Sequence, residues 1–121
     1  DPRTVHYCID TAQVSILGED LLTFYDQYHE RISTFHLKDT ASAKQPDSVR
    51  YAQDPEIADD GFRWFWEPGL GTLDLEGLYG LLKKHGFEGW MSIEYDGSPD
   101  QLASMALTRY HLDNVLRPIY D

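Results

Sequence analysis

Strand-like and helix-like segments alternate along this chain, and that order is its strongest constraint on the fold. Runs rich in β-branched and aromatic residues predict strands at 4–10, 32–38 and 90–95, and helical periodicity with capping residues predicts helices at 20–31, 74–85 and 99–116. A βαβαβα order favours parallel strands joined by right-handed crossovers. Three parallel strands leave two faces and two edges to cover, so we expect part of a larger sheet or barrel.

The ends of the predicted elements follow from local residue chemistry. Asp20 and Asp74 are suited to cap the first turns of their helices, and Gly86 to end the second helix in a left-handed conformation. A loop containing Gly18 is expected after the first strand, and Pro118 is expected to stop the last helix. The predicted buried stripe of that last helix is Leu102, Met105, Ala106 and Leu112.

Residues 39–73 lack sustained periodicity, which makes this segment long for a connection within a compact domain. Connections of this length are typical of lids or insertions. The adjacent aromatics Trp64, Phe65 and Trp66 are costly to leave in water, so we expect a lid or an ordered insert. Closure over a bound substrate and packing against a neighbouring subunit both explain the three aromatics.

Charge and cysteine content narrow the possible partners and compartment. The chain has 10 Lys and Arg against 21 Asp and Glu, a net charge of −11 that would repel nucleic acid. Cys8 is the only cysteine, so a disulfide framework within the chain is excluded and a reducing compartment is expected. The absence of a long apolar run and of a basic-then-apolar leader predicts a soluble cytoplasmic protein with no membrane partner.

Each predicted strand carries a metal-competent side chain near its C-terminal end, namely Asp10, His36 and Glu94. Active sites of parallel α/β folds are built at that end of the sheet. Two carboxylates and an imidazole suit Mn²⁺, Mg²⁺, Co²⁺ or Zn²⁺. A helix cap or a salt bridge would be the ordinary explanation for any one of the three residues, but three on matching faces favour a metal site.

Strand alternation supports this interpretation because it separates a polar face from an apolar one. The residues that share a face with the three candidates are His6, Cys8, Thr34, Lys38, Ser92 and Asp96. The residues of the opposite parity are Val5, Tyr7, Ile9, Phe35, Leu37, Met91 and Ile93, a set suited to packing under helices. The polar face is therefore expected to hold the chemistry.

Four motifs in this order carry a family resemblance that covers nearly the whole chain apart from the insert at about 40–66. They are Cys8-Ile-Asp-Thr-Ala-Gln13, Arg31-Ile-Ser-Thr-Phe-His-Leu-Lys-Asp39, Gly69-Leu-Gly-Thr-Leu-Asp74 and Gly86-Phe-Glu-Gly-Trp-Met-Ser-Ile-Glu-Tyr-Asp96. Together they resemble the C-terminal part of the xylose-isomerase-like TIM barrels, the sugar isomerase/epimerase superfamily that includes inosose dehydratase and ketose 3-epimerases.

The resemblance implies an α/β fold in which the chain supplies strands 6–8, the C-terminal βαβαβα portion of a (β/α)₈ TIM barrel, with a long insert after its second strand. Asp10, His36 and Glu94 then fall on three of the family's four metal-ligand positions, with Mn²⁺ the first candidate metal. The fourth ligand, a Glu on strand 5, would lie upstream of Asp1. The implied partners are an N-terminal barrel portion or another subunit, and a homo-oligomer.

The activity that the resemblance implies is a metal-dependent isomerase, epimerase or inosose-dehydratase-like lyase acting on a sugar, cyclitol or related keto-polyol. Glu94 would remove an α-proton to give a metal-stabilised enediolate, and Lys38 would polarise the carbonyl. Lys38, Gln13, Trp64 and Trp66 would bind substrate. Gln13 departs from the His found there in many members, and it cannot exchange a proton near neutral pH. A surface Lys38 paired with Asp39 explains that motif equally well.

Three other interpretations remain open. Endonuclease IV has the same barrel architecture and a related metal site, although a net charge of −11 opposes DNA binding. A non-catalytic or incomplete barrel fragment would bind a ligand or a partner chain without turnover, which the missing Glu and the altered Gln13 favour. A plain α/β domain would hold no metal.

Overall fold

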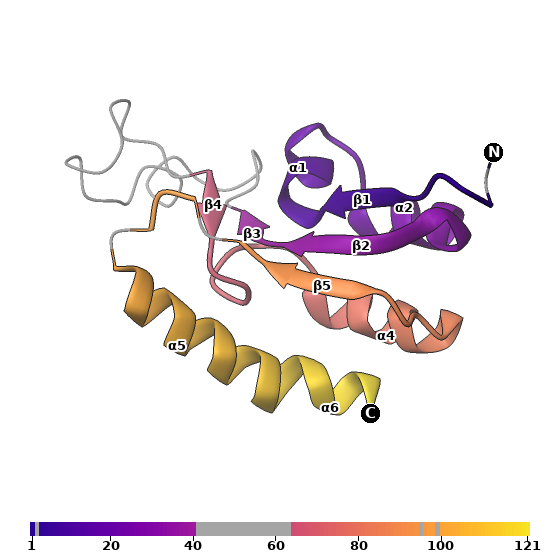
Figure 1. Ribbon diagram of the computed structural model, residues 1–121. Coiled ribbons are helices and arrows are strands. Elements are labelled where there is room, and N and C mark those ends of the chain that lie inside the picture. The colour runs from indigo at the N-terminus through magenta and orange to yellow at the C-terminus, as the bar shows by residue number, and fades with distance from the viewer. Residues whose placement is uncertain (2, 41–63, 95, 99) are drawn as a thin grey trace.

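A parallel three-stranded sheet lies at the centre of the computed structural model, which describes residues 1, 3–40, 64–94, 96–98 and 100–121. Its strands are β1 (Tyr7–Asp10), β2 (Ile32–Leu37) and β5 (Trp90–Ile93), in the spatial order β1-β2-β5 (Figure 1). Asp10 lies beside His36, and His36 lies beside Ser92. This register brings the C-terminal ends of the three strands together.

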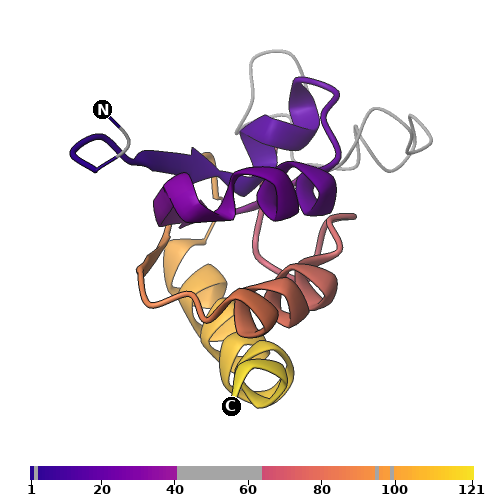
Figure 2. The same cartoon turned by 90° about the vertical axis from the view of Figure 1, so that its right-hand side faces the viewer.

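Helices cover one face of the sheet. Figures 1 and 2 show α2 (Leu21–Tyr28) and α4 (Leu75–His85) on the same side of the strands. Of the predicted apolar parity, Ile9, Phe35 and Leu37 are buried against this layer. Val5 and Tyr7 were predicted to share this buried face, but they are 55% and 42% exposed. The helix residues in the same core are Val14, Leu21, Tyr25, Leu75, Leu78, Tyr79, Leu82 and Leu116.

The first strand is shorter than the predicted range 4–10, because β1 begins at Tyr7. The backbone N–H groups of Thr4 and Val5 both donate to the carbonyl oxygen of Asp1, at 3.1 and 3.0 Å, which draws this stretch into a turn. Directly after the strand, a helix α1 (Thr11–Ile16) stands where a loop was predicted. At six residues α1 is too short to show helical periodicity in sequence.

The two central helices begin at the predicted acidic caps. Asp20 accepts a hydrogen bond from the N–H of Thr23 at 2.8 Å, and Asp74 accepts one from the N–H of Gly77 at 2.7 Å. A 3₁₀ turn η1 (His29–Arg31) extends α2 to β2. Gly86 ends α4 with a φ of 62°, the left-handed conformation that glycine adopts without strain.

The C-terminal helix does not stop before Pro118, which corrects the predicted end near Leu116. It consists of α5 (Gln101–His111), a π-helical turn η2 (Leu112–Leu116) and α6 (Arg117–Tyr120). Pro118 lies in the first turn of α6, where a missing N–H and a fixed φ are tolerated. The proline therefore sits at the junction that the π turn creates.

The predicted buried stripe of this helix is also wrong for most of its members. Leu102 is 79% exposed and Met105 is 57% exposed, whereas the polar residues Ser104 and Thr108 are buried. The side-chain hydroxyl of Ser104 donates to the carboxylate of Glu67, which is itself buried. A polar contact thus sets the face that α5 turns inward.

The predicted insert contains a short antiparallel pair. β3 (Asp39–Thr40) pairs with β4 (Phe65–Trp66), and the hydroxyl of Thr40 donates to the carbonyl oxygen of Trp64 at 2.6 Å. Residues 41–63 of the predicted lid lie outside the described residues.

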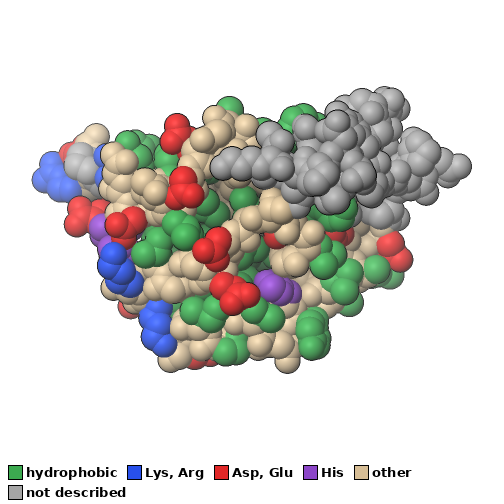
Figure 3. All heavy atoms as spheres, turned by 180° about the vertical axis from the view of Figure 1, so that it is seen from behind, with side chains coloured by type: hydrophobic (Ala, Val, Ile, Leu, Met, Phe, Trp, Pro, Cys, Tyr) green, Lys and Arg blue, Asp and Glu red, His purple; other side chains and the backbone are tan. Residues whose placement is uncertain are grey.

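Figure 3 views the molecule from behind relative to Figure 1, with acidic side chains spread over this face and the visible Lys and Arg side chains at one end. Among the helices that the structure describes, none has the length and apolar character needed to cross a bilayer.

Candidate metal centre

Asp10, His36 and Glu94 converge at the C-terminal edge of the sheet. One potential ligand atom from each lies within 4.8 Å of the other two. Asp10 and His36 are paired positions of neighbouring strands, and Glu94 follows the β5 residue that pairs with Leu37. All three side chains are partly exposed, so they line an accessible surface.

Asp10 has two roles at this edge. Its Oδ1 accepts hydrogen bonds from the N–H groups of Ala12 at 2.9 Å and Gln13 at 3.0 Å, which caps α1. Its Oδ2 lies 3.2 Å from the ammonium of Lys38. Helix capping and a place in the cluster are therefore compatible, because they use different oxygens of one carboxylate.

The arrangement of Glu94 fits a cation. Its Oε2 lies 2.8 Å from Nδ1 of His36 and 3.0 Å from Nζ of Lys38. This oxygen is buried, and among the described residues its close polar neighbours are these two nitrogens. A buried carboxylate oxygen next to an imidazole and a second carboxylate suits a divalent metal of the Mn²⁺, Mg²⁺, Co²⁺ or Zn²⁺ class.

Lys38 lies inside the cluster and is only 4% exposed, which excludes a surface lysine paired with Asp39. Besides Asp10 and Glu94, its Nζ contacts Oδ2 of Asp96 at 2.5 Å and lies 4.3 Å from the centre of the Phe65 ring. Burial by itself would lower the pKa of Lys38, but contacts with Asp96, Glu94 and Asp10 raise it above its ordinary value. The ammonium is charged at neutral pH.

The backbone of Lys38 is held by Thr11, the first residue of α1. The Thr11 hydroxyl donates to the Lys38 carbonyl oxygen at 2.5 Å and accepts from the Lys38 N–H at 2.9 Å. Thr11 is fully buried. The segment after β1 thus fixes the residue after β2.

Asp39 belongs to the same motif as Lys38, but its carboxylate binds backbone N–H groups. It is 1% exposed, and its two carboxylate oxygens accept hydrogen bonds from the backbone N–H groups of Thr40, Gly69, Gly71 and Leu73. Burial raises the pKa of Asp39, and these four hydrogen bonds oppose that effect. Asp39 organises the segment that leads from β4 to α4.

Of the predicted substrate-binding residues, Lys38 is the one for which the described part of the chain shows side-chain contacts with the metal candidates. Gln13 is exposed in α1, Trp64 is 45% exposed before β4, and Trp66 is partly buried within β4. Their roles stay predictions. Of the three adjacent aromatics, Phe65 is the one whose ring faces the Lys38 ammonium.

The contacts of Asp96 and Phe65 with Lys38 were not predicted from sequence. Parity had placed Asp96 on the polar face with Glu94, and Phe65 had been assigned with its two neighbours to a lid or an ordered insert. The position of Phe65 depends on the pairing of β4 with β3, which brings residues far apart in the chain together.

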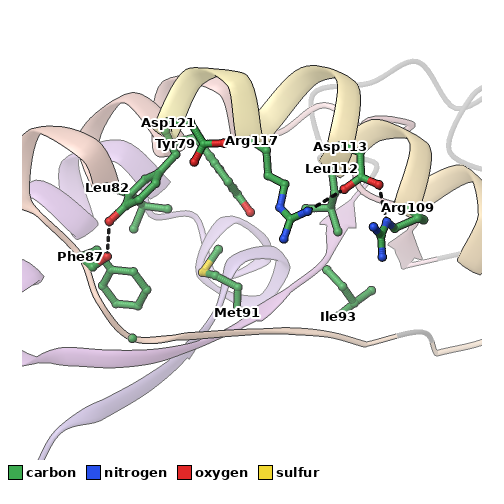
Figure 4. Close-up of a pocket in the computed structure, with 12 residues that line it drawn as sticks. Tyr79, Leu82, Phe87, Met91, Ile93, Arg109, Leu112, Asp113, Arg117 and Asp121 are labelled. Atoms are coloured by element: carbon green, nitrogen blue, oxygen red, sulfur yellow. Dashed lines mark hydrogen bonds and ion pairs between the residues drawn. The ribbon is translucent and has the colours of Figure 1, made fainter.

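A cavity of about 340 Å³ lies on the opposite, helix-covered face of β5 (Figure 4). Met91 and Ile93 point into it from the strand, and the ion pairs of Asp113 with Arg109 and Arg117 lie along its helix side. Ser92 and Glu94 have the other parity, so this cavity is separate from the metal candidates.

Three relatives match along most of the chain. An inosose dehydratase of Lacticaseibacillus casei is 29% identical over 99 residues, covering 82% of this chain and 33% of the relative. One of Bacillus velezensis is 30% identical over 121 residues, covering 96% and 40%, and one of Salmonella typhimurium is 25% identical, covering 97% and 40%. The chain therefore spans between a third and two fifths of these relatives' length.

The family described as xylose isomerase-like TIM barrel matches residues 1–114. This match includes all three strands and every residue of the candidate metal centre. The chain belongs to the xylose isomerase-like TIM barrel family.

Proposed function

We propose that Asp10, His36 and Glu94 hold a catalytic divalent metal, with Mn²⁺ the first candidate. The observation that carries this proposal is the convergence of their ligand atoms within 4.8 Å, at the strand ends where barrel enzymes place their active sites. The bound metal would act as a Lewis acid toward the oxygens of the substrate.

The chain would contribute strands 6–8 of the barrel, and the remaining strands, including the one that bears a fourth ligand, would come from outside these 121 residues. The relatives' greater length supports this arrangement. Within the described residues, β1 and β5 are the edge strands of the parallel sheet, so both edges are placed to continue it. The predicted homo-oligomer stays a prediction.

The substrate that we propose is a sugar, cyclitol or related keto-polyol, and the reaction begins with removal of the proton next to its carbonyl. Glu94 is the candidate base. Both of its close contacts use Oε2, so Oε1 is the atom that we assign to take the proton. Return of the proton to a neighbouring carbon would give an isomer or an epimer. Departure of a β-hydroxyl as water would instead give a dehydrated product.

Lys38 is suited to stabilise the oxygen of the substrate carbonyl. As the α-proton leaves, negative charge develops on that oxygen, and a nearby ammonium donating a hydrogen bond lowers the barrier. The burial of Lys38 strengthens this effect because solvent screens the charge poorly there. Three contacting carboxylates and the Phe65 ring keep the ammonium in place before substrate arrives.

The test combines metal analysis with an activity assay on the protein in its native form. We expect bound divalent metal in the wild type, lower metal content in the His36→Ala variant, and dehydration of an inosose or isomerisation of a related keto-sugar. His29→Ala, on the helix side of the sheet, is the matched control and should keep the metal. Metal content that His36→Ala leaves unchanged would refute the site. Retained metal without turnover of any keto-polyol would instead favour a non-catalytic binding module.

A further inference from the structure

The ammonium of Lys38 lies where it satisfies two of the three metal candidates at once. Nζ is 3.2 Å from Oδ2 of Asp10 and 3.0 Å from Oε2 of Glu94. A third carboxylate, that of Asp96, contacts the same Nζ at 2.5 Å but is not a member of the metal cluster. Lys38 therefore has two kinds of partner. A metal would also bind Asp10 and Glu94, whereas Asp96 would contact Lys38 alone.

We propose that Lys38 stands in for the cation when the metal is absent, and that Asp96 retains its ammonium when the metal takes over Asp10 and Glu94. Lys38 thereby competes with the metal for Asp10 and Glu94, and Asp96 weakens this competition. This inference rests on the proposed metal site, and it assigns Asp96 as a positioning residue that acts through Lys38.

The charges of the cluster support the exchange. Asp10, Glu94 and Asp96 together carry three negative charges, and Lys38 supplies one positive charge. A divalent cation added to these four side chains would balance their formal charges, and the fourth acidic ligand proposed from outside this chain would add one negative charge. Keeping Lys38 nearby as the metal binds therefore limits the net negative charge of a partly buried site.

The groups around Nζ can keep the Lys38 ammonium near the site when a metal binds. The Lys38 side chain is only 5% exposed, so it has little room to leave, whereas that of Asp96 is 51% exposed and reaches the site from the segment after β5. The Phe65 ring, 4.3 Å from Nζ, offers a cation–π contact on another element, β4. Asp96 and Phe65 can hold the ammonium without Asp10 or Glu94.

The test is calorimetric titration of the metal-stripped native protein with MnCl₂. We expect Lys38→Met to tighten Mn²⁺ binding by about tenfold or more, because a competing charge is removed beside the metal. We expect Asp96→Asn to weaken binding by about tenfold, because the ammonium then depends on Asp10 and Glu94. Asp96→Asn in the Lys38→Met background should have little effect, since Asp96 acts through Lys38.

Lys84→Met and Asp26→Asn are the matched controls. Lys84 and Asp26 form an ion pair of 2.9 Å between α4 and α2, and both side chains are well exposed. Neither substitution should change the affinity for Mn²⁺. A general effect of net charge on metal binding would appear in these variants too.

The outcomes separate the inference from the proposed function. Equal Mn²⁺ affinity in the wild type and Lys38→Met would overturn the inference alone, and so would an Asp96→Asn effect of the same size in both backgrounds. No Mn²⁺ binding by any of these proteins would refute the metal site and the inference with it. If Lys38→Met does not fold, Asp96→Asn keeps the lysine and decides the matter, because unchanged affinity in that variant contradicts the proposal.

Discussion

Replacing Thr11 by Val tests how the backbone of Lys38, beside the candidate metal centre, is held in place. The two side chains have nearly the same shape, but valine cannot replace the hydroxyl that joins the N–H and carbonyl groups of Lys38 at 2.9 and 2.5 Å. Both residues are buried, so water cannot readily satisfy the two abandoned groups. A buried polar group that loses its partner costs about 1–3 kcal/mol. We therefore expect the free energy of unfolding to fall by about 2–5 kcal/mol.

Urea denaturation of the wild type and of the Thr11→Val and Thr11→Ser variants would measure this effect. Serine keeps the hydroxyl and loses one methyl group, for which we expect about 1 kcal/mol. Thr23→Val, at an exposed position of α2, is the control and should change stability by less than about 0.5 kcal/mol. If Thr11→Ser destabilised the protein as much as Thr11→Val, packing rather than hydrogen bonding would hold this position, and our reasoning would be wrong.

Three further predictions concern the scaffold. A hydrogen bond from His85 is the main cause that lowers the pKa of Asp26 from 3.8 to about 2. The ionised Asp26 carboxylate therefore stabilises the fold above about pH 4, and this contribution is lost as the pH falls toward 2. When the free energy of unfolding is measured against pH, Asp26→Asn should remove the loss in this window. Gly71→Ala would bring a Cβ into steric conflict with the carboxylate of Asp39, so the free energy of unfolding should fall by about 2 kcal/mol or more, measured as a lower melting temperature. Leu78→Ala, at a fully buried core position, should cost about 2–5 kcal/mol in urea denaturation.

Elements with strong local signals were predictable from sequence. α4 combines an acidic cap at Asp74 with a glycine at position 86 that ends the helix, and both act through contacts within a few residues. α1 escaped prediction because a single cap at Asp10 and six residues give no period to detect. The inward face of α5 could not be predicted either, since it depends on the buried contact of Ser104 with Glu67, 37 residues away.

The metal candidates were predictable for a different reason. Parallel strands place their C-terminal ends at one edge, so the strand order alone brings Asp10, His36 and Glu94 together. The surroundings of Lys38 could not be predicted in the same way. Parity placed the residue on the correct face, but it could not show that three carboxylates surround its ammonium. That depends on side-chain reach and on the position of Asp96 after β5, which periodicity does not encode.

The polar face of the sheet, which would face the interior of a complete barrel, carries the most exposed aromatic residue of the described strands. Trp90 is 78% exposed, and it lies beside Thr34, which in turn lies beside Cys8, one layer below the level of Asp10 and His36. Inward side chains of a (β/α)₈ barrel fill its interior in layers. An indole in the layer beneath the metal candidates would be covered by the strands that complete a barrel of this family. The parity of Trp90 therefore fits a position inside the proposed barrel, where its indole would lie beneath the proposed site.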